Sequence, residues 1–189
     1  MRAIGPAPAM GRAIYTQAQI AAAVERLARA IAADHRGQLL VLLGVLKGGV
    51  CLISDLARAL SAIHGGPSEI MVEHLVVSRY RGSQQSDSPM ELLSDSGRSL
   101  EGAAAVLVDT IVDRGLTLAA LQALLKERRP ASLRTCVLLD KPARRRTAVQ
   151  LDYRGLAAPD SFIIGYGLDY KEWYRGLPYL AELREEHTV

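Results

Sequence analysis

The chain has 189 residues, of which 49% are hydrophobic and 23% charged, and its formal net charge at pH 7 is +3. This length and composition are typical of one folded domain with a real core and exclude extensive disorder. The small positive charge suits an anionic ligand but does not by itself indicate nucleic-acid binding, and no apolar run approaches the roughly 20 residues of a membrane span.

The ends and the cysteines indicate a cytoplasmic protein. Cys51 and Cys136 each lie inside an apolar run, so we expect buried, reduced thiols rather than a nucleophile or a disulfide. Glycine and prolines interrupt the first ten residues, so no signal peptide is expected. We therefore predict a single domain over residues 1–189, in which residues 1–13 form a loose N-terminal tail.

The first half of the chain alternates helix and strand patterns. Thr16 is the expected N-cap of a helix over residues 17–33, whose apolar residues recur every three or four positions. The apolar run 39–45 predicts a buried strand that ends at Lys47-Gly48-Gly49. A second helix follows over residues 50–61, and a second strand over residues 70–78.

The second half begins with a polar segment over residues 79–100, rich in serine and glycine. This segment predicts a long loop or an irregular hairpin, of the kind that often covers a site. Strands are predicted at 103–108, 133–139 and 162–165, with a helix at 117–126 and a basic loop at 142–147. The alternation predicts an α/β protein with a parallel sheet, whose ligand lies at the carboxyl ends of the strands, where Lys47, Asp109 and Lys141 emerge.

Residues 105–118 form the most informative motif, in which a β-branched run leads into Asp109, Asp113, Gly115 and a helix start near Thr117. Carboxylates at a strand end accept hydrogen bonds from sugar hydroxyls, and free amides at a helix start attract phosphate. Asp113 is placed to act as a general base, and Thr117 to cap the helix and donate to a 5′-phosphate. The alternative is a strand end with two solvated acids, which accounts for the residue types but not for their dense order.

Three further segments carry candidate ligand contacts, each with an ordinary structural alternative. Lys47-Gly48-Gly49 offers a cation and accessible amides for phosphate, but is also a common turn. Lys141 follows a strand and can donate to a carbonyl oxygen, as a surface lysine also can. Phe162 is the only phenylalanine and suits base stacking or core packing, and Asp169 suits a metal or a solvated loop.

The remaining polar groups give weaker signals. The four histidines are widely separated, without the spacing of zinc ligands. The arginines at positions 144–146 are more typical of a solvated face than of a nucleic-acid patch.

In their order along the chain, these segments resemble the hypoxanthine-guanine branch of the type I phosphoribosyltransferases, from about residue 14 to residue 179. The resemblance implies a central, mostly parallel sheet flanked by helices, a small hood subdomain and a mobile lid loop over residues 79–100. It also implies a Mg²⁺ cofactor, the small-molecule substrates 5-phosphoribosyl pyrophosphate, hypoxanthine and guanine, and a homodimer or homotetramer.

The resemblance also assigns a role to each matching residue. It implies that Asp113 exchanges a proton with purine N7, that Asp109 and Asp169 are linked to the metal, and that Ser78, Arg79 and Tyr80 begin the lid. The implied contacts to phosphate and pyrophosphate are Lys47, Gly48, Asp109, Thr110, Asp113, Arg114, Gly115, Leu116, Thr117 and Arg175. The implied contacts to the purine are Lys141, Phe162, Ile163 and Asp169.

The sequence departs from the family pattern at two positions. Thr110 replaces the second of two adjacent acids, and the loss of one charge-assisted hydrogen bond costs about 1.5–3 kcal/mol, or roughly ten- to a hundredfold in affinity. Arg114 replaces a small hydroxyl residue of the phosphate loop. A loop that binds phosphate through backbone amides tolerates this arginine, whereas a loop that needs the hydroxyl is impaired.

The leading hypothesis is therefore a magnesium-dependent hypoxanthine-guanine phosphoribosyltransferase of purine salvage. Two alternatives remain open at this point. One is a regulatory protein of the same fold that binds nucleotide and RNA with little catalysis. The other is a phosphoribosyltransferase that prefers xanthine.

Overall fold

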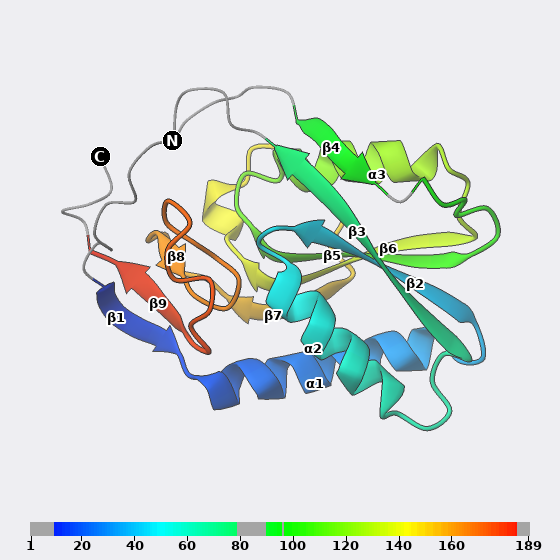
Figure 1. The fold of residues 1–189 in the computed structure, drawn as a ribbon, viewed down its shortest axis with the longest axis horizontal. Helices are drawn as coiled ribbons and strands as arrows, with labels where there is room; N and C mark the ends of the chain where they lie inside the picture. The colour runs from blue at the N-terminus through cyan, green and yellow to red at the C-terminus, as the bar shows by residue number, and fades with distance from the viewer. Residues whose placement is uncertain (1–9, 79–89, 96, 185–189) are drawn as a thin grey trace.

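Two β-sheets organise the molecule. The computed structural model describes residues 10–78, 90–95 and 97–184, and Figure 1 shows their arrangement. A six-stranded sheet has the order β4-β3-β2-β5-β6-β7, and every pair in it is parallel except β3 with β4. A three-stranded sheet has the order β1-β9-β8, and both of its pairs are antiparallel. The prediction of an α/β fold with a mostly parallel central sheet is confirmed.

The large sheet contains β2 (Leu39–Leu46), β3 (Glu69–Ser78), β4 (Glu91–Asp95), β5 (Ala104–Val112), β6 (Ser132–Asp140) and β7 (Tyr153–Ala157). The small sheet contains β1 (Met10–Tyr15), β8 (Ile163–Ile164) and β9 (Leu180–Leu183). The helices are α1 (Gln17–Asp34), α2 (Val50–Ser61), α3 (Leu116–Lys126) and a short 3₁₀ turn, η1 (Pro142–Arg144).

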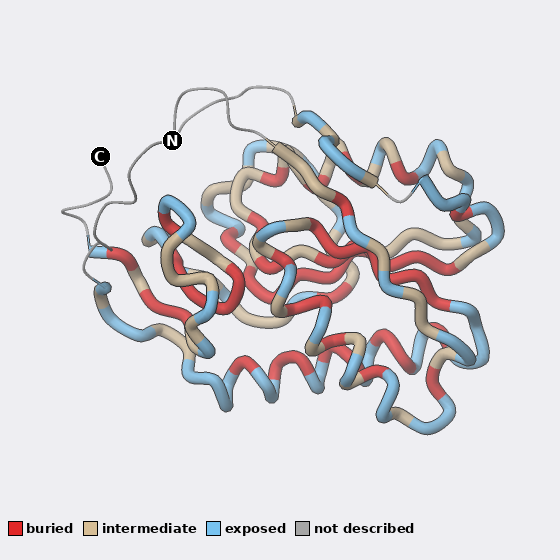
Figure 2. The backbone as a smooth tube through the Cα atoms, in the orientation of Figure 1, coloured by how far each residue is buried: buried red, intermediate tan, exposed pale blue. Residues whose placement is uncertain are grey.

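Alternating side chains of the buried strands build a core on each face of the large sheet. Leu40 and Leu42 of β2 pack with α1 and α2, whereas Val41 and Leu43 pack with α3 on the opposite face. Both faces are covered by helices, so the central strands are apolar along their whole length rather than alternating with polar residues. Figure 2 shows the consequence as a continuous buried stretch through the middle of the sheet.

The two long helices were predicted closely because their ends carry local signals. Thr16 caps α1 through a reciprocal pair of bonds: its hydroxyl accepts from the backbone N–H of Gln19 at 3.3 Å, and the Gln19 side chain accepts from the backbone N–H of Thr16 at 2.9 Å. The helix α2 has the predicted bounds, and its buried face consists of Leu52, Ile53, Leu56 and Leu60. None of the helices among the described residues is long and apolar enough to cross a membrane.

Several sequence expectations were wrong. Residues 10–13, expected to be part of a loose tail, belong to β1, which pairs with β9. The strand predicted at 103–108 continues to Val112, so Asp109 and Thr110 lie within β5. The predicted loop 79–100 contains β4, which pairs antiparallel with β3, in keeping with the hairpin alternative. The strands β7 and β9 were not predicted, because they are short and have no strong alternation.

The small sheet brings both ends of the described chain together. It corresponds to the expected hood subdomain, and Figure 1 places it beside the carboxyl ends of the large sheet. Ile163, Tyr166 and Leu180 join the same core cluster as α1 and α2, so the two sheets share buried contacts.

Candidate active site

The candidate site lies where the parallel strands β2, β5 and β6 end, an edge of the sheet that we call the carboxyl edge. Because neighbouring parallel strands end side by side, the segments that follow Leu46, Val112 and Asp140 emerge together. The small sheet contributes a fourth segment, the loop of residues 165–177 between β8 and β9. The sequence predicted this meeting point, and the structure brings most of the predicted residues to it in two groups.

The first group is built on the turn between β2 and α2. The Leu46–Lys47 peptide is cis, and the backbone N–H of Gly49 donates to the Val45 carbonyl at 2.8 Å. A Cβ atom on Gly49 would lie 2.6 Å from that same carbonyl oxygen, so only glycine fits this tight turn. The helix α2 opens directly afterwards with no side-chain cap. The Val50 N–H donates to the Lys47 carbonyl at 3.2 Å, so the amides that follow it in the first turn are the ones that can meet an anion.

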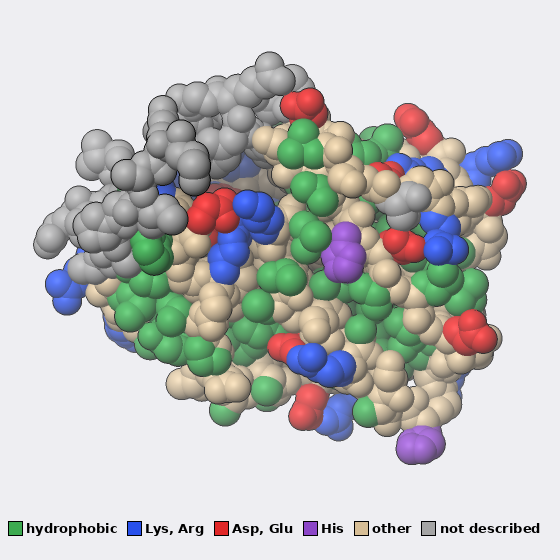
Figure 3. Space-filling view, in the orientation of Figure 1, with side chains coloured by type: hydrophobic (Ala, Val, Ile, Leu, Met, Phe, Trp, Pro, Cys, Tyr) green, Lys and Arg blue, Asp and Glu red, His purple; other side chains and the backbone are tan. Residues whose placement is uncertain are grey.

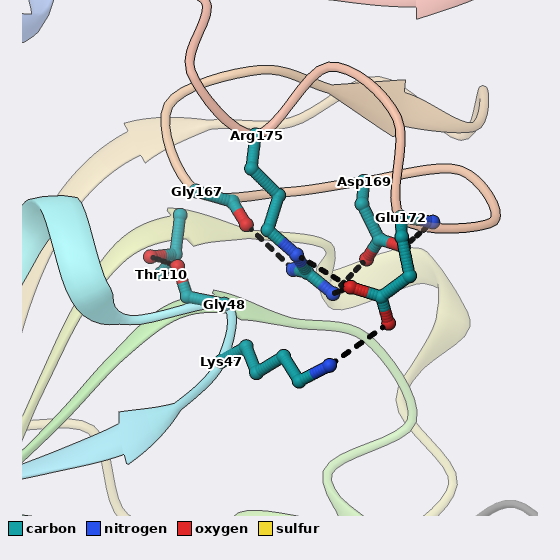
Figure 4. Close-up of polar contacts among 7 residues, drawn as sticks. All are labelled: Lys47, Gly48, Thr110, Gly167, Asp169, Glu172 and Arg175. Carbon is teal, nitrogen blue, oxygen red and sulfur yellow. Dashed lines mark hydrogen bonds and ion pairs between the residues drawn. The ribbon is translucent and has the colours of Figure 1, made fainter. Parts of the chain in front are cut away.

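Thr110 supports this turn from the neighbouring strand. Its side chain is fully buried, and its hydroxyl donates to the Gly48 carbonyl at 2.9 Å (Figure 4). The hydroxyl therefore ties β5 to the turn that carries Lys47. Its predicted hydrogen bond to a ribose hydroxyl stays a prediction.

Asp109, the residue before Thr110, has an unusual carboxyl group. Burial raises its pKa to about 7, although the backbone N–H groups of Thr110 and Ile111 oppose the shift. The Thr110 N–H donates to Asp109 Oδ1 at 2.8 Å, so one carboxyl oxygen is already engaged. Burial therefore favours the uncharged carboxyl, which can bond to hydroxyl groups, and a bound cation would have to offset this shift.

The loop 165–177 faces the Lys47 turn across the site. Asp169 Oδ1 lies 2.9 Å from Arg175 Nη2, and Arg175 Nη1 donates to the Gly167 carbonyl at 2.8 Å. A Cβ atom on Gly167 would lie 2.2 Å from the Gly48 carbonyl oxygen, so the two backbones touch. The predicted residues Lys47, Gly48, Asp169 and Arg175 are thus brought together, as Figure 4 shows.

Glu172 completes this group and was not predicted from the sequence. Its carboxylate lies between Lys47 Nζ, at 3.2 Å, and the Arg175 guanidinium, at 3.2 Å (Figure 4). Slight burial acts against ionisation of Glu172, but Lys47 and Arg175 outweigh it and hold the pKa of the carboxyl below its usual value. The only sequence signal was an acid placed between Asp169 and Arg175 in an otherwise matching motif.

A partly buried hydrogen bond anchors this loop to α2. The Tyr166 hydroxyl donates to Asp55 Oδ2 at 2.6 Å, and burial together with that carboxylate raises the pKa of Tyr166 above its ordinary value. Because α2 begins at the Lys47 turn, Tyr166 couples the two segments that face each other across the site.

The second group begins with the phosphate-type loop at residues 113–117. Gly115 adopts a φ of +86° as the N-cap of α3, and a Cβ atom there would lie 2.7 Å from the Thr147 carbonyl oxygen. The Arg114 carbonyl accepts from the backbone N–H groups of Arg146 and Thr147 at 3.0 and 3.1 Å. These bonds hold the loop so that the first amides of α3, including those of Leu116 and Thr117, are free of acceptors within the helix.

The predicted cap of this helix was wrong. The helix α3 begins at Leu116, one residue earlier than expected, and Gly115 rather than Thr117 is its N-cap. Thr117 therefore lies in the first helical turn. A backbone cradle needs no hydroxyl at position 114, which favours the view that Arg114 is tolerated there.

Asp113 lies at the start of this loop and pairs with an arginine that the sequence did not single out. Arg144 Nε lies 3.1 Å from Asp113 Oδ1, and Arg144 Nη1 lies 3.2 Å from Asp160 Oδ1. Arg145 in turn pairs with Asp140. The expectation of a merely solvated basic face is therefore wrong for these two arginines, because both bind acids at the carboxyl edge.

Lys141 lies near Asp113, and Phe162 directly follows Ser161, whose carbonyl Lys141 contacts. Lys141 is only 5% exposed, its Nζ donates to the Ser161 carbonyl at 2.6 Å, and burial lowers its pKa. Phe162 is 44% exposed and makes an edge contact with Tyr170, with ring centroids 5.6 Å apart. The alternative that the single phenylalanine packs in the core is wrong, because its side chain is exposed, and its stacking on a base stays a prediction. The Ile163 side chain is buried in β8, which leaves its backbone for ligand contacts.

The described residues include only the start of the expected lid, and they offer single carboxylates rather than a complete metal site. Ser78 is the last residue of β3, whereas Arg79 and Tyr80 lie outside the described residues. Within the described part of the chain, no cluster of three or more His, Cys, Asp or Glu side chains could hold a metal ion alone. Asp169 uses both carboxylate oxygens within its loop, with Arg175 and with the Glu172 N–H. One or two carboxylates together with substrate oxygens are nevertheless the usual ligand set of Mg²⁺, so these residues fit a metal that arrives with a phosphorylated ligand.

Comparison with known proteins is consistent with this geometry. Residues 10–171 match the family described as the phosphoribosyl transferase domain. The hypoxanthine-guanine phosphoribosyltransferase of Dictyostelium discoideum is 41% identical over 174 residues, which cover 92% of this chain and 95% of that protein. The enzyme of the same name from Staphylococcus aureus (strain Mu50) is 34% identical over 173 residues, 92% of this chain and 93% of that protein. The crystal structure of a hypoxanthine phosphoribosyltransferase from S. aureus superimposes with a TM-score of 0.86 at 32% identity and covers 95% of both chains.

Proposed function

The chain belongs to the phosphoribosyl transferase domain family, and we propose that it acts as a hypoxanthine-guanine phosphoribosyltransferase. In this reaction the 5-phosphoribosyl group of 5-phosphoribosyl pyrophosphate moves to N9 of a 6-oxopurine. The products are IMP or GMP and pyrophosphate, so the enzyme salvages free purine bases.

One observation carries the proposal. The carboxyl edge joins a cationic group around Lys47 and Arg175 to a second group around Asp113, Gly115 and Lys141. The first suits a pyrophosphate, and the second suits a 5′-phosphate next to a purine. A donor sugar bound through its two phosphate ends would hold its reacting carbon between them, next to the base.

The chemistry follows from these positions. The bond between C1 of the ribose and the pyrophosphate oxygen breaks, and its electron pair leaves with the pyrophosphate. N9 of the purine donates the pair that forms the new bond to C1, and Asp113 takes the proton from N7. Positive charge develops on the ribose and negative charge on the leaving group, so the Lys47 turn and Arg175 stabilise the departing pyrophosphate.

Lys141 accounts for the selection of 6-oxopurines. An ammonium has three N–H donors, and the Ser161 carbonyl takes one of them, which leaves donors for the O6 atom. Adenine presents an amino donor at the same place, so the Lys141 donors that face the base would find no acceptor there. Stacking on the exposed ring of Phe162 holds either base in plane.

We further propose that Mg²⁺ enters with the substrate and is met by Asp109 and Asp169, where it would neutralise charge on the pyrophosphate. The lid that begins at Ser78 would exclude water from the activated sugar. We also propose a single domain and a cytoplasmic location. We further propose a homodimer or homotetramer, and size-exclusion chromatography with light scattering would measure its mass.

The comparisons give no support to the regulatory alternative, and two features of the site count against it. Thr110 has a defined role under the Lys47 turn, and Arg144 and Arg145 of the basic loop pair with acids of the site. A preference for xanthine remains a matter for the assay.

The test is a steady-state assay with hypoxanthine, guanine, xanthine and adenine, with and without magnesium. We expect magnesium-dependent turnover with the 6-oxopurines and little with adenine, and we expect Asp113→Asn to lower kcat by about 10²- to 10⁴-fold. Nucleotide binding without turnover by the wild-type protein would contradict the proposal.

A further inference from the structure

Glu172 binds the two cations that face the pyrophosphate position. Its Oε1 lies 3.2 Å from Lys47 Nζ, and its Oε2 lies 3.2 Å from Arg175 Nη2 and 3.3 Å from Arg175 Nε (Figure 4). Both carboxylate oxygens are thus engaged, one by each cation. Lys47 comes from the β2–α2 turn and Arg175 from the loop 165–177, so Glu172 bridges the two sides of the site.

The backbone around Glu172 is held by other groups. The Glu172 N–H donates to Asp169 Oδ2 at 2.7 Å, and Arg175 is held separately by Asp169 and by the Gly167 carbonyl. Arg175 would therefore keep its place without the Glu172 carboxylate. The carboxylate contributes charge at the mouth of the site rather than support for the loop.

The Lys47–Glu172 ion pair is exposed to solvent. Figure 3 shows acidic and basic side chains side by side in the region of the site, next to the residues drawn in grey. The Lys47 and Glu172 side chains are 65% and 63% exposed, so water and an incoming ligand can reach both. Their pairing is therefore reversible at small cost.

We propose that Glu172 sets the affinity of the site for pyrophosphate by competing with it for Lys47 and Arg175, an inference that rests on the proposed phosphoribosyl transfer. In the free protein the carboxylate neutralises both cations. A pyrophosphate group needs the same donors and is repelled by the carboxylate, so Glu172 must turn away when it binds. Its return to the cations would help the product pyrophosphate to leave.

The size of the effect follows from the exposure of the contacts. An exposed ion pair changes an equilibrium by a factor of roughly one to five, and Glu172 makes two such contacts. Removal of the charge should tighten binding by about three- to tenfold, and the gain should shrink at high salt because exposed charges are screened.

The experiment compares Glu172→Gln and Glu172→Ala with the wild type. Isothermal titration calorimetry would measure the Kd of inorganic pyrophosphate with magnesium present, and kinetics would measure KM for 5-phosphoribosyl pyrophosphate separately from kcat. Glu69→Gln is the matched control, because Glu69 is exposed and lies at the amino end of β3, at the opposite edge of the sheet. It removes the same charge far from the site.

We expect both Glu172 variants to bind pyrophosphate about three- to tenfold more tightly, with a lower KM for the sugar substrate, while Glu69→Gln stays within about twofold. Unchanged or weaker binding in the Glu172 variants, with a wild type that turns over normally, would overturn the inference alone. A wild type that forms no nucleotide and binds no pyrophosphate would overturn both the inference and the proposed function.

Discussion

Thr110→Val tests whether the departure from the family's acidic pair serves the turn that carries Lys47. Valine has nearly the shape of threonine but lacks the hydroxyl, so the change removes the 2.9 Å bond to the Gly48 carbonyl from a fully buried position. A neutral hydrogen bond contributes about 1 kcal/mol to stability. For a protein of this size, that loss corresponds to a decrease in Tm of roughly 2–4 °C.

The functional consequence should be selective. Gly48 belongs to the predicted pyrophosphate contacts, so a looser turn should raise KM for 5-phosphoribosyl pyrophosphate while KM for hypoxanthine changes little. We expect an increase of about three- to tenfold, from a loss near 1 kcal/mol. Thr110→Ser keeps the hydroxyl and should restore the KM of the wild type.

The control is Thr135→Val, on the adjacent strand β6. Thr135 is also buried, at 1% exposure, and its hydroxyl accepts from Gln122 Nε2 at 2.7 Å, away from the carboxyl edge. This variant should lose similar stability without any change in KM. If both variants shift KM equally, or if Thr110→Val leaves KM for the sugar substrate unchanged, the assignment of Thr110 to the turn is refuted.

Three further predictions concern the second group of site residues. Arg144→Gln removes the ion pair with Asp113. It should lower kcat by about tenfold at an unchanged KM for the sugar substrate, because the Asp113 carboxylate loses its orientation. Equal effects on kcat and KM would contradict this. Lys141→Met should lower kcat/KM for hypoxanthine by about ten- to a hundredfold through loss of a charged donor, without a matching loss for adenine in a competition assay. Gly115→Ala should lower the free energy of unfolding, measured in urea, by more than Gly102→Ala does. Both glycines have a positive φ, but only at Gly115 would the new Cβ meet a carbonyl oxygen, at 2.7 Å.

The helices and the central strands could be read from the sequence because their signals are local. An N-cap residue, a three- and four-residue apolar spacing and a continuous apolar run each lie within one element. The strands β1, β7 and β9 gave no such signal. A short edge strand is specified by its partner rather than by its own residues, and β1 finds its partner β9 at the other end of the described chain.

The candidate site divides in the same way. Lys47, Asp113, Gly115 and Lys141 were found because each follows an apolar run, and parallel strands bring such positions to one edge. Arg144 was judged a solvated surface residue, because only the fold places it against Asp113. The start of α3 was misplaced by one residue, because a glycine with positive φ can replace a side-chain cap.

The sequence by itself determined the alternation of helices and strands and most of the polar groups that gather at the carboxyl edge, because these depend on periodicity and on residue types at strand ends. Only the tertiary structure decided what those groups do before a ligand arrives. Thr110 reaches Gly48 across 62 positions, and Glu172 reaches Lys47 across 125. Contacts over such separations depend on how the strands and loops pack in three dimensions, and no local pattern in the chain encodes them.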